Sequence, residues 1–390
     1  MDNPKRLKIA YYSINDPLDK RSWSGITYYL GRALQKNIGD VDYLGPVEIP
    51  WLLDKLFRAL QKTSRLLFRS EWIPKYSLAK NAYAALVLKR RMRGKPYDLL
   101  LAPAAAPELA LLRTRVPIVY FGDATFKIYS STYEKEFRDC SALTKWEGNY
   151  LENSALKKSR LVILASRWAA RSAVADYGVP EDKVVVILLG ANMDEIPAAA
   201  AIYQKQQNKT LTLLFLAVDW DRKGGEIAFE TLQRLLSLGH EAKLIVCGCV
   251  PPARYTCPEV EVVPFIDKNR PEDQALFRQI LLSAHFLLVP TRADCSLLVA
   301  MEANAYGIPA ITTDVGGVGD VVTGGINGYC LPPGDRGERY AALIAEIYSD
   351  QGRYRRLMET SRARFESDLN WDKWAARLKQ ELFRRGLPGG

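Results

Sequence analysis

Two cations and two glycines stand together in residues 219–225, which have the sequence DWDRKGG. The segment lies between a predicted strand and a predicted helix. Backbone amides and the dipole at a helix N-terminus add to the charges of Arg222 and Lys223, so such a segment can hold a diphosphate. A solvated loop is the alternative for an isolated segment of this kind. The two aspartates of the segment could suggest a metal-bound diphosphate, but the cations already supply positive charge, and we expect no metal site.

Two carboxylates, Asp294 and Glu302, lie eight residues apart in a second segment. This segment follows the predicted strand 285–289, so we expect residues 294–296 at a helix N-terminus and Glu302 about 12 Å further along that helix. The spacing is comparable with the length of a nucleoside diphosphate sugar, and one carboxylate could meet a sugar while the other meets a ribose diol. The alternative is a capping aspartate with an unrelated glutamate.

Other common signatures of chemistry are absent from the sequence. There is no GxGxxG after a strand, no GxxxxGK[ST], no HExxH and no GxSxG, so dehydrogenases, P-loop NTPases, zinc proteases and esterases are not indicated. The six cysteines lack paired CxxC spacing, and only two histidines could supplement them in a zinc site. We therefore expect free thiols in a reducing compartment.

The elements that must position these segments alternate along the chain between strands and helices. This alternation predicts parallel sheets covered by helices, and ligands of such sheets bind beyond the carboxyl ends of the strands. The expected strands of the first half are 8–14, 98–102, 117–121, 161–164 and 184–188. Those of the second half are 211–217, 243–247, 261–265, 285–289 and 310–313.

A chain of 390 residues with 48% apolar and 25% charged residues is expected to fold as two globular domains. We expect an N-terminal domain at 1–190, a linker at 191–209, a C-terminal domain at 210–365 and a terminal helix within 366–390. Four alanines and the polar run 204–209 indicate the linker, because they lack periodicity. No uncharged stretch reaches the roughly twenty residues that cross a bilayer, and residues 1–19 lack a signal-peptide apolar region, so we expect a cytoplasmic protein.

Taken in order, these segments resemble the C-terminal domain of retaining GT-B glycosyltransferases of the family 4 type, which are related to glycogen and sucrose synthases. The loop with Arg222 and Lys223 resembles the family's diphosphate-binding segment. Asp294 and Glu302 resemble its E-x7-E motif, and residues 316–317 resemble the glycine pair that follows the motif. The resemblance implies a GT-B fold, with two Rossmann-like, doubly wound α/β domains facing a central cleft and a C-terminal helix that crosses back to the first domain.

The resemblance also implies a role for each matching residue. Arg222 and Lys223 would bind the diphosphate, and Glu302 would bind the ribose. Asp294 would contact the transferred sugar, although the family more often has a glutamate there, which reaches one methylene further. The remaining donor contacts implied by the resemblance come from Gly25, Ile266, Cys295, Ser296 and Leu297.

The loop 121–126 occupies a place where several family members use a histidine near the reacting sugar. Neither His240 nor His285 lies in this loop. Asp123 in the loop could accept a hydrogen bond from the sugar or from the acceptor hydroxyl, which makes it a candidate catalytic residue beside Asp294. A structural capping role for Asp123 is the alternative.

Positive charge is concentrated in one part of the N-terminal half. The chain has a formal net charge of +10, and residues 55–95 hold twelve Lys or Arg and one acidic residue. Basic amphipathic helices with aromatic residues can lie on anionic membranes, so peripheral membrane contact through residues 55–95 is one interpretation. A solvated basic face whose apolar residues pack on the core is the alternative. No nucleic-acid-binding motif accompanies the charge, and we expect no nucleic-acid partner.

The resemblance therefore implies an enzyme that moves a hexose from a nucleotide diphosphate sugar to an acceptor hydroxyl with retention of anomeric configuration. We expect a donor of the UDP, GDP or ADP type, a carbohydrate or lipid-linked acceptor, and no cofactor or metal. Two alternatives remain open. One is a nucleotide-sugar epimerase of the same architecture, which needs no acceptor, and the other is a non-enzymatic protein that binds anionic membranes.

Overall fold

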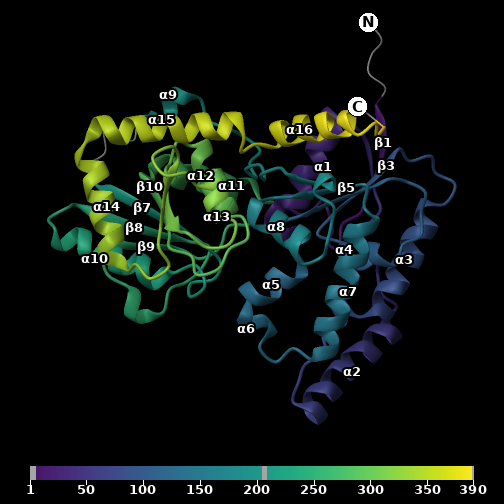
Figure 1. The fold of residues 1–390 in the computed structure, drawn as a ribbon. Helices are drawn as coiled ribbons and strands as arrows, with labels where there is room; N and C mark the ends of the chain where they lie inside the picture. Colours follow the sequence, from purple (N-terminus) through teal and green to yellow (C-terminus); the bar gives the residue numbers. More distant parts are fainter. Residues whose placement is uncertain (1–5, 204–208, 389–390) are drawn as a thin grey trace, which may run out of the picture. The chain divides into compact units, whose positions relative to one another are not determined.

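The chain divides into two compact units in a computed structural model that describes residues 6–203 and 209–388. Unit 1 comprises Met1–Ile187 together with Ala375–Gly390, and unit 2 comprises Leu188–Trp374. Part of the expected linker, residues 204–208, lies outside the described residues. Each unit contains a six-stranded sheet of parallel strands flanked by helices, which confirms the predicted α/β class and its two Rossmann-like sheets (Figure 1).

The sheet of unit 1 has the strand order β2-β1-β3-β4-β5-β6. Its strands are β1 (Leu7–Tyr11), β2 (Gly39–Tyr43), β3 (Leu99–Pro103), β4 (Ile118–Gly122), β5 (Leu161–Leu164) and β6 (Val184–Val186). All of these strands except β2 were predicted. The strand β2 was not predicted because its sequence, GDVDY, contains two aspartates, which are uncommon in strands. The strand β1 pairs with β2 on one side and with β3 on the other, so the direction of the strand order reverses beside β1.

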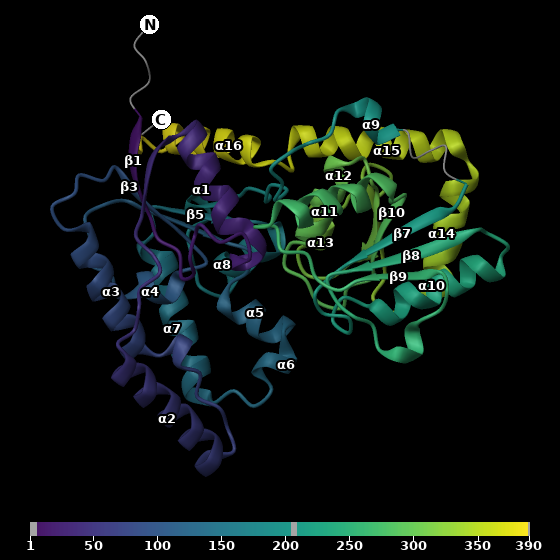
Figure 2. The ribbon, with the colours of Figure 1, turned by 180° about the vertical axis from the view of Figure 1, so that it is seen from behind.

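Helices in the segments between the strands flank this sheet (Figures 1 and 2). They are α1 (Ile26–Asn37), α2 (Trp51–Phe68), α3 (Leu78–Met92), α4 (Ala106–Ala110), α5 (Phe126–Thr132), α6 (Glu134–Phe137), α7 (Ala142–Lys158) and α8 (Arg167–Ala175). Serine side chains cap the N-termini of three of them, because Ser77, Ser141 and Ser166 accept hydrogen bonds from the first turns of α3, α7 and α8. Two short 3-10 helices, η1 (Ser22–Gly25) and η2 (Pro74–Tyr76), precede α1 and α3.

The sheet of unit 2 has the strand order β12-β11-β10-β7-β8-β9. Its strands are β7 (Leu211–Leu216), β8 (Ala242–Cys247), β9 (Val260–Val263), β10 (Phe286–Val289), β11 (Ala310–Thr313) and β12 (Gly328–Leu331). The sequence did not predict β12, because it follows a run of glycines typical of turns. The strand order reverses between β7 and β10, and the loops after these two strands therefore adjoin the same crevice.

The helices of unit 2 include α9 (Ala199–Tyr203), α10 (Gly225–Ser237), α11 (Pro271–Ser283), α12 (Leu298–Ala305), α13 (Val318–Val321), α14 (Gly337–Ser349) and α15 (Gln351–Ser367). Apolar side chains of α10, α14 and α15 pack on β7, β8 and β10 in one buried cluster. The last helix, α16 (Trp371–Arg384), begins in unit 2 and ends in unit 1.

Candidate functional site

The loops after β7 and β10 are hydrogen-bonded to each other at the point where the strand order of unit 2 reverses. The backbone N–H of Arg292 donates to the carbonyl of Arg222 at 2.7 Å. Arg222 Nη1 donates in turn to the carbonyl of Ala293 at 3.1 Å, across 71 positions of sequence. These bonds bring the segment 219–225 beside the segment 294–302, as their predicted roles in one site require.

An ion pair between Lys223 and Asp294 joins the two loops. The two side chains are only 12% and 11% exposed. Asp294 Oδ1 also accepts the backbone N–H of Leu297 at 3.2 Å. Burial alone would raise the pKa of Asp294, but the Lys223 ammonium, these hydrogen bonds and the charge of Arg222 outweigh burial and hold its pKa below the ordinary value. Asp294 is therefore an ionised, oriented acceptor suited to sugar hydroxyl groups.

The paired glycines of the β7 loop are explained by packing. Gly224 has a φ of +76°, and a Cβ atom there would lie 2.0 Å from the carbonyl oxygen of Pro290. A Cβ atom on Gly225 would lie 2.2 Å from the ring of Trp220. The amides of residues 222–225 donate to residues 219–221 within the loop. The positive charge of this loop is therefore supplied by its side chains, and these four amides already have partners.

Residues 294–296 lie at the N-terminus of α12, as expected, but the helix itself begins only at Leu298. The helical rise expected between Asp294 and Glu302 therefore does not apply. Leu297 ends the loop with a φ of +36° and a ψ of 58°, a left-handed conformation that is unfavourable for leucine. The hydroxyl of Ser296 is buried and has no hydrogen-bond partner among the described residues, while Cys295 beside it is 3% exposed. A buried hydroxyl without a partner is costly, and a ligand oxygen would satisfy it.

Glu302 lies on α12 and is 2% exposed. Its Oε1 atom accepts from Lys268 Nζ at 2.5 Å, and Lys268 also lies 3.4 Å from the carbonyl of Asn192. Burial raises the pKa of Glu302 above its ordinary value, although Lys268 and the backbone of Asn192 act in the opposite direction. Sequence reasoning missed Lys268, because a single lysine in the loop before α11 has no signature that links it to a residue 34 positions away.

Ile266 was expected just past a strand ending at residue 265. The strand β9 ends earlier, at Val263, so Ile266 lies in the loop between β9 and α11, where its side chain is half-buried. It precedes Lys268 by two positions. Its predicted role as a base contact stays a prediction.

The first-loop glycine, Gly25, is in unit 1 and ends the 3-10 helix η1. Trp23, Ser24 and Gly25 have φ values of +47°, +55° and +88°. Three consecutive residues in the left-handed region are unusual, and for the tryptophan and the serine this conformation costs of order 1 kcal/mol each. The ring of Trp23 lies 5.9 Å from that of Phe121, the penultimate residue of β4. Backbone strain of this kind clusters at functional sites.

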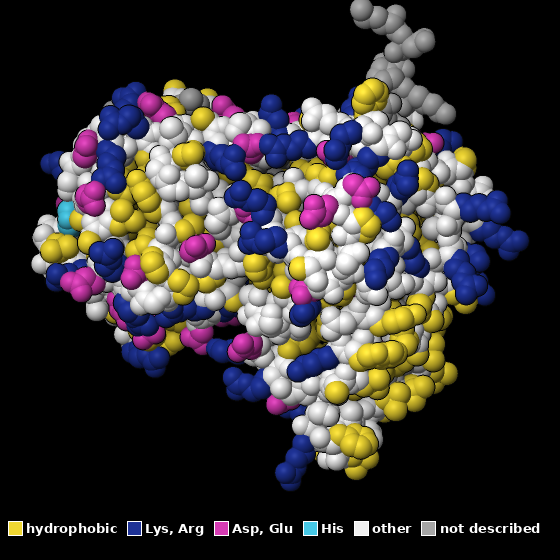
Figure 3. Space-filling view, viewed as in Figure 1, with side chains coloured by type: hydrophobic (Ala, Val, Ile, Leu, Met, Phe, Trp, Pro, Cys, Tyr) yellow, Lys and Arg dark blue, Asp and Glu magenta, His cyan; other side chains and the backbone are white. Residues whose placement is uncertain are grey.

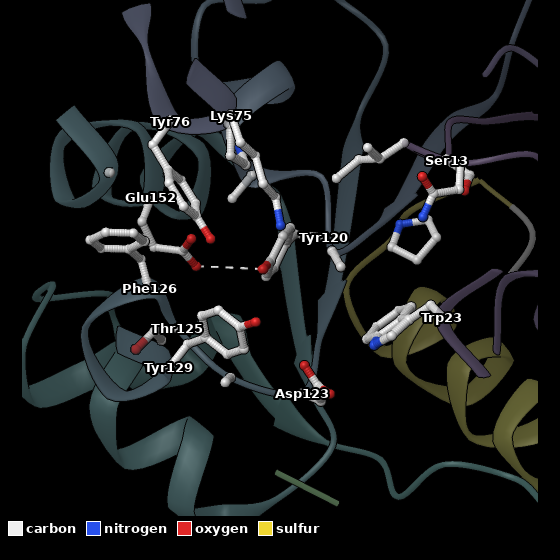
Figure 4. Close-up of a pocket in the computed structure, with 18 of the residues that line it drawn as sticks. Ser13, Trp23, Lys75, Tyr76, Tyr120, Asp123, Thr125, Phe126, Tyr129 and Glu152 are labelled. Atoms are coloured by element: carbon white, nitrogen blue, oxygen red, sulfur yellow. Dashed lines mark hydrogen bonds between the residues drawn. The ribbon is translucent and has the colours of Figure 1, made fainter. Parts of the chain in front are cut away.

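A cavity of 530 Å³ lies in unit 1 beside the loops that follow β1, β3 and β4 (Figure 4). Trp23 and Asp123, the catalytic candidate of the β4 loop, both line it. Its other charged or hydroxyl-bearing lining residues include Ser13, Thr27, Lys75, Tyr76, Lys80, Tyr120, Thr125, Tyr129 and Glu152. The cavity thus occupies the reversal point of the unit 1 sheet, the place where doubly wound sheets bind ligands.

Two buried carboxyl groups lie at this cavity or close to it. Glu152, on α7, lines the cavity and is 5% exposed, and Tyr120 donates to its Oε1 atom at 3.4 Å. Burial raises the pKa of Glu152 to about 8. Burial also raises the pKa of Glu108 to about 7, and its Oε2 atom has no hydrogen-bond partner among the described residues. Neither glutamate was predicted, because nothing local in a helical sequence marks a glutamate as buried.

The basic region 55–95 forms α2, η2 and α3. The helix α3 packs on the core, but Phe57 is the single buried residue of α2. Figure 3 shows hydrophobic side chains gathered at the lower right of this view, over the part of unit 1 where Figure 1 shows α2. The exposed large apolar residues of α2 are Trp51, Leu52, Leu56, Leu60, Leu66, Leu67 and Phe68. For α2, the alternative that its apolar residues pack on the core is therefore wrong.

Residues 6–203 and 209–388 contain neither a membrane-spanning helix nor a metal-binding cluster. In this part of the chain, no helix combines the length and the apolar character needed to span a bilayer. In the same residues, no three His, Cys, Asp or Glu side chains are grouped as a metal site requires.

Family models match both halves of the chain. Residues 26–195 match the model described as Glycosyltransferase Family 4. Residues 210–350 match the model described as Glycosyl transferases group 1. Together the two matches include most of both sheets and all the candidate residues of unit 2.

Individual proteins are similar to the chain at lower identity. The D-inositol 3-phosphate glycosyltransferase of Xylanimonas cellulosilytica is 24% identical over 244 residues, which cover 58% of this chain and 57% of that protein. The chain spans less than two thirds of the length of the first curated relatives that it matches.

Two solved structures share the fold over nearly the whole chain. The catalytic domain of starch synthase IV from Arabidopsis thaliana, bound to ADP and acarbose, has a TM-score of 0.67 at 16% identity and covers 98% of this chain and 99% of that one. Anabaena HepE in complex with UDP has a TM-score of 0.64 at 15% identity, covering 97% of this chain and 100% of that one.

Proposed function

The chain belongs to the glycosyltransferases of group 1 and family 4, with the GT-B fold, and on that premise we propose that it transfers a hexose from a nucleotide diphosphate sugar to an acceptor hydroxyl with retention of anomeric configuration. The observation that carries the proposal is the pairing of Lys223 with Asp294 beside the unpartnered hydroxyl of Ser296. A cation, an ionised acceptor and a free donor thus converge at the reversal point of the unit 2 sheet.

In this proposal the donor binds along the loops after β7 and β10. Asp294 accepts hydrogen bonds from the transferred sugar, and Glu302 accepts them from the ribose. Arg222 and Lys223 hold the diphosphate, and the hydroxyl of Ser296 donates to a sugar or phosphate oxygen. The backbone near Ile266 contacts the base, and the structures of HepE with UDP and of starch synthase IV with ADP support a nucleotide diphosphate as the ligand class.

The chemical step breaks the bond between the anomeric carbon and the diphosphate oxygen, which keeps the bonding electrons. A new bond forms from that carbon to the acceptor oxygen, whose proton passes to the released diphosphate. Negative charge grows on the leaving diphosphate, and the cationic side chains of Arg222 and Lys223 stabilise it without a divalent metal. In unit 1, the strained loop at Gly25 contacts the donor phosphates and the acceptor, and Asp123 accepts a hydrogen bond from the reacting hydroxyl.

A thermal-shift screen with UDP, GDP, ADP and their sugars tests the donor site. One diphosphate is expected to raise the melting temperature by roughly 5 to 10 °C at a concentration near 100 times its Kd, because it binds only the folded protein. The shift is expected to persist in chelator and to be lost in Arg222→Ala. It should remain in Arg356→Ala, which removes an exposed arginine of α15.

No shift with any nucleotide would overturn the proposed donor site. Loss of the shift in chelator would overturn metal independence alone. Conversion of the donor sugar to an epimer, in the absence of any acceptor, would identify a nucleotide-sugar epimerase instead of a transferase.

We further propose that α2 holds the enzyme on anionic membranes. The exposed apolar residues of α2 are accompanied by Lys55, Arg58, Lys62 and Arg65, with Asp54 as the one acidic residue of the helix. Apolar side chains combined with cations match a surface of anionic lipid headgroups over acyl chains.

Vesicle flotation tests this contact. The protein is expected to float with vesicles rich in phosphatidylglycerol and not with phosphatidylcholine alone. Replacing both Leu67 and Phe68 by serine should lower the membrane partition coefficient at least tenfold. Each substitution removes roughly 1.5 to 3 kcal/mol of favourable free energy from burying an apolar side chain in the membrane. The matched control replaces Val250 and Phe383, which are similarly exposed in other parts of the chain. Equal binding of both double variants would contradict the proposal.

A further inference from the structure

The cavity of unit 1 has opposite chemistry on its two sides. Asp123 lies on one side together with Trp23, and Lys75 lies on the other side with Tyr76 (Figure 4). Its volume of 530 Å³ falls within the range of small-molecule sites. A ligand that fills the cavity therefore meets a carboxylate on one side and the Lys75 ammonium on the other, and Lys80 is also among the lining residues.

The ammonium end is not neutralised by the protein. Lys75 is exposed, Lys80 is half-buried, and no ion pair joins either of them to a carboxylate in the described part of the chain. The Lys75 Nζ atom lies 5.3 Å from the centre of the Tyr76 ring, over which it projects. The nearby carboxyls of Glu108 and Glu152 have pKa values raised by burial to about 7 and about 8, so they offset little of this charge below neutral pH.

The wall between the two ends combines aromatic rings with hydroxyl groups. Tyr76, Tyr120 and Tyr129 direct polar groups toward the interior together with Glu152, and the ring of Phe126 closes the wall (Figure 4). Apolar ring faces with polar edges suit a sugar ring, whose C–H faces are apolar and whose rim carries hydroxyls. Phe126 can lie there because α7 has no side chain at residue 148, where a Cβ atom would be 2.4 Å from the ring.

We propose that this cavity is the acceptor site and that the acceptor is a phosphate-bearing sugar, whose phosphate binds Lys75 and Lys80 and whose hydroxyls meet Glu152 and the tyrosines. The inference rests on the proposed function. The phosphate at the lysine end directs the opposite, hydroxyl-bearing edge of the sugar toward Asp123, where the new glycosidic bond forms. The phosphate belongs either to a soluble sugar phosphate or to a lipid-linked sugar diphosphate, and the two share the chemistry that the lysines recognise.

Isothermal titration without any donor tests this site. The probes are hexose 1- and 6-phosphates, their unphosphorylated parents, and a polyprenyl diphosphate sugar in detergent micelles. A phosphate-bearing probe is expected to bind the wild-type protein, and the variant Lys75→Ala/Lys80→Ala should bind it about 10- to 100-fold more weakly. The control Lys145→Ala/Lys157→Ala removes the same charge from exposed lysines of α7 and should keep wild-type affinity.

Each outcome decides the proposal. Binding of soluble probes identifies a free sugar phosphate, and binding of the micellar probe alone identifies a lipid-linked acceptor. Unphosphorylated sugars that bind as tightly as phosphorylated ones, retained affinity in the double variant, or no binding by any phosphate-bearing probe would each overturn it. Nucleotide-induced thermal shifts in the same variants report on unit 2 alone. A normal shift with no phosphosugar binding would refute the acceptor site only, whereas phosphosugar binding without any nucleotide shift would refute the proposed transferase.

Discussion

Replacing Lys223 by alanine is expected to lower kcat about 10²- to 10³-fold, the range found when one preorganised donor to a developing anion is removed. Lys223 is 12% exposed, so water replaces its charge poorly. Its loss also leaves the carboxylate of Asp294 buried without its main counter-charge. The measurement is steady-state turnover of the donor that gives the thermal shift, with its preferred acceptor and over a range of donor concentrations.

Two further variants separate chemistry from folding in this experiment. Lys223→Ala/Asp294→Asn removes the uncompensated carboxylate and should recover most of the free energy of unfolding that Lys223→Ala loses, while turnover stays low. Lys243→Ala breaks a more exposed lysine–glutamate pair with Glu261 in the same unit and should leave turnover unchanged. Turnover of Lys223→Ala within threefold of wild type would remove this residue from the machinery that stabilises the leaving group.

The stability of unit 1 is expected to fall as pH rises from about 4.5 to about 8. Folding raises the pKa of Glu152 to about 8 and that of Glu108 to about 7, both from an ordinary value of 4.5. The folded state therefore keeps protons that the unfolded state releases, and their stabilising contribution is complete below pH 4.5 and lost as pH passes through the folded-state values. For Glu152 alone the difference is roughly 3 to 5 kcal/mol.

The variant Glu152→Gln tests this pH dependence. Glutamine cannot ionise and keeps a hydrogen-bonding group for Tyr120, so the variant should match wild type at pH 4 and exceed its stability at pH 8.5. Hydrogen exchange of the α7 amides at the two pH values measures the change within unit 1. The control is Glu134→Gln, which alters an exposed glutamate of α6 and should leave the pH dependence intact. An identical pH dependence in wild type and Glu152→Gln would show that this carboxyl is ionised when folded.

The sequence predicted those parts of the fold that depend on local patterns. Strands with continuous apolar residues, such as β5 and β7, were predicted within one residue of their observed ends. The strand β2 was missed because its residues have little strand propensity of their own. It is a strand because it pairs with β1 at the edge of the sheet, where Asp40 and Asp42 are tolerated. The start of α12 was predicted too early because Leu297 has a left-handed conformation and the helix begins only after it. Nothing in the local sequence predicts that a leucine adopts this conformation.

The candidate site divides in the same way. Arg222, Lys223, Asp294 and Glu302 were selected as candidates because their spacing follows the strands. The structure brings the two loops of unit 2 together, and the roles of these residues stay predictions. The ion pair between Lys268 and Glu302 depends on the conformation of the loop between β9 and α11, which the local sequence does not predict. The buried state of Glu152 likewise follows from tertiary packing of α7.

The division of the chain has a consequence for recombining members of this family. Unit 2, Leu188–Trp374, is an insertion between two pieces of unit 1, so exchanging unit 2 between relatives requires two junctions. The first junction falls in the loop after β6, whose residues 187–192 are all buried. The second falls inside α16, where one inserted or deleted residue would rotate every following side chain by about 100° around the helix axis. A chimera that exchanges unit 2 must therefore preserve the helical phase of α16, whereas domain swaps that end between α15 and α16, at residues 368–370, or beyond residue 384 avoid this constraint.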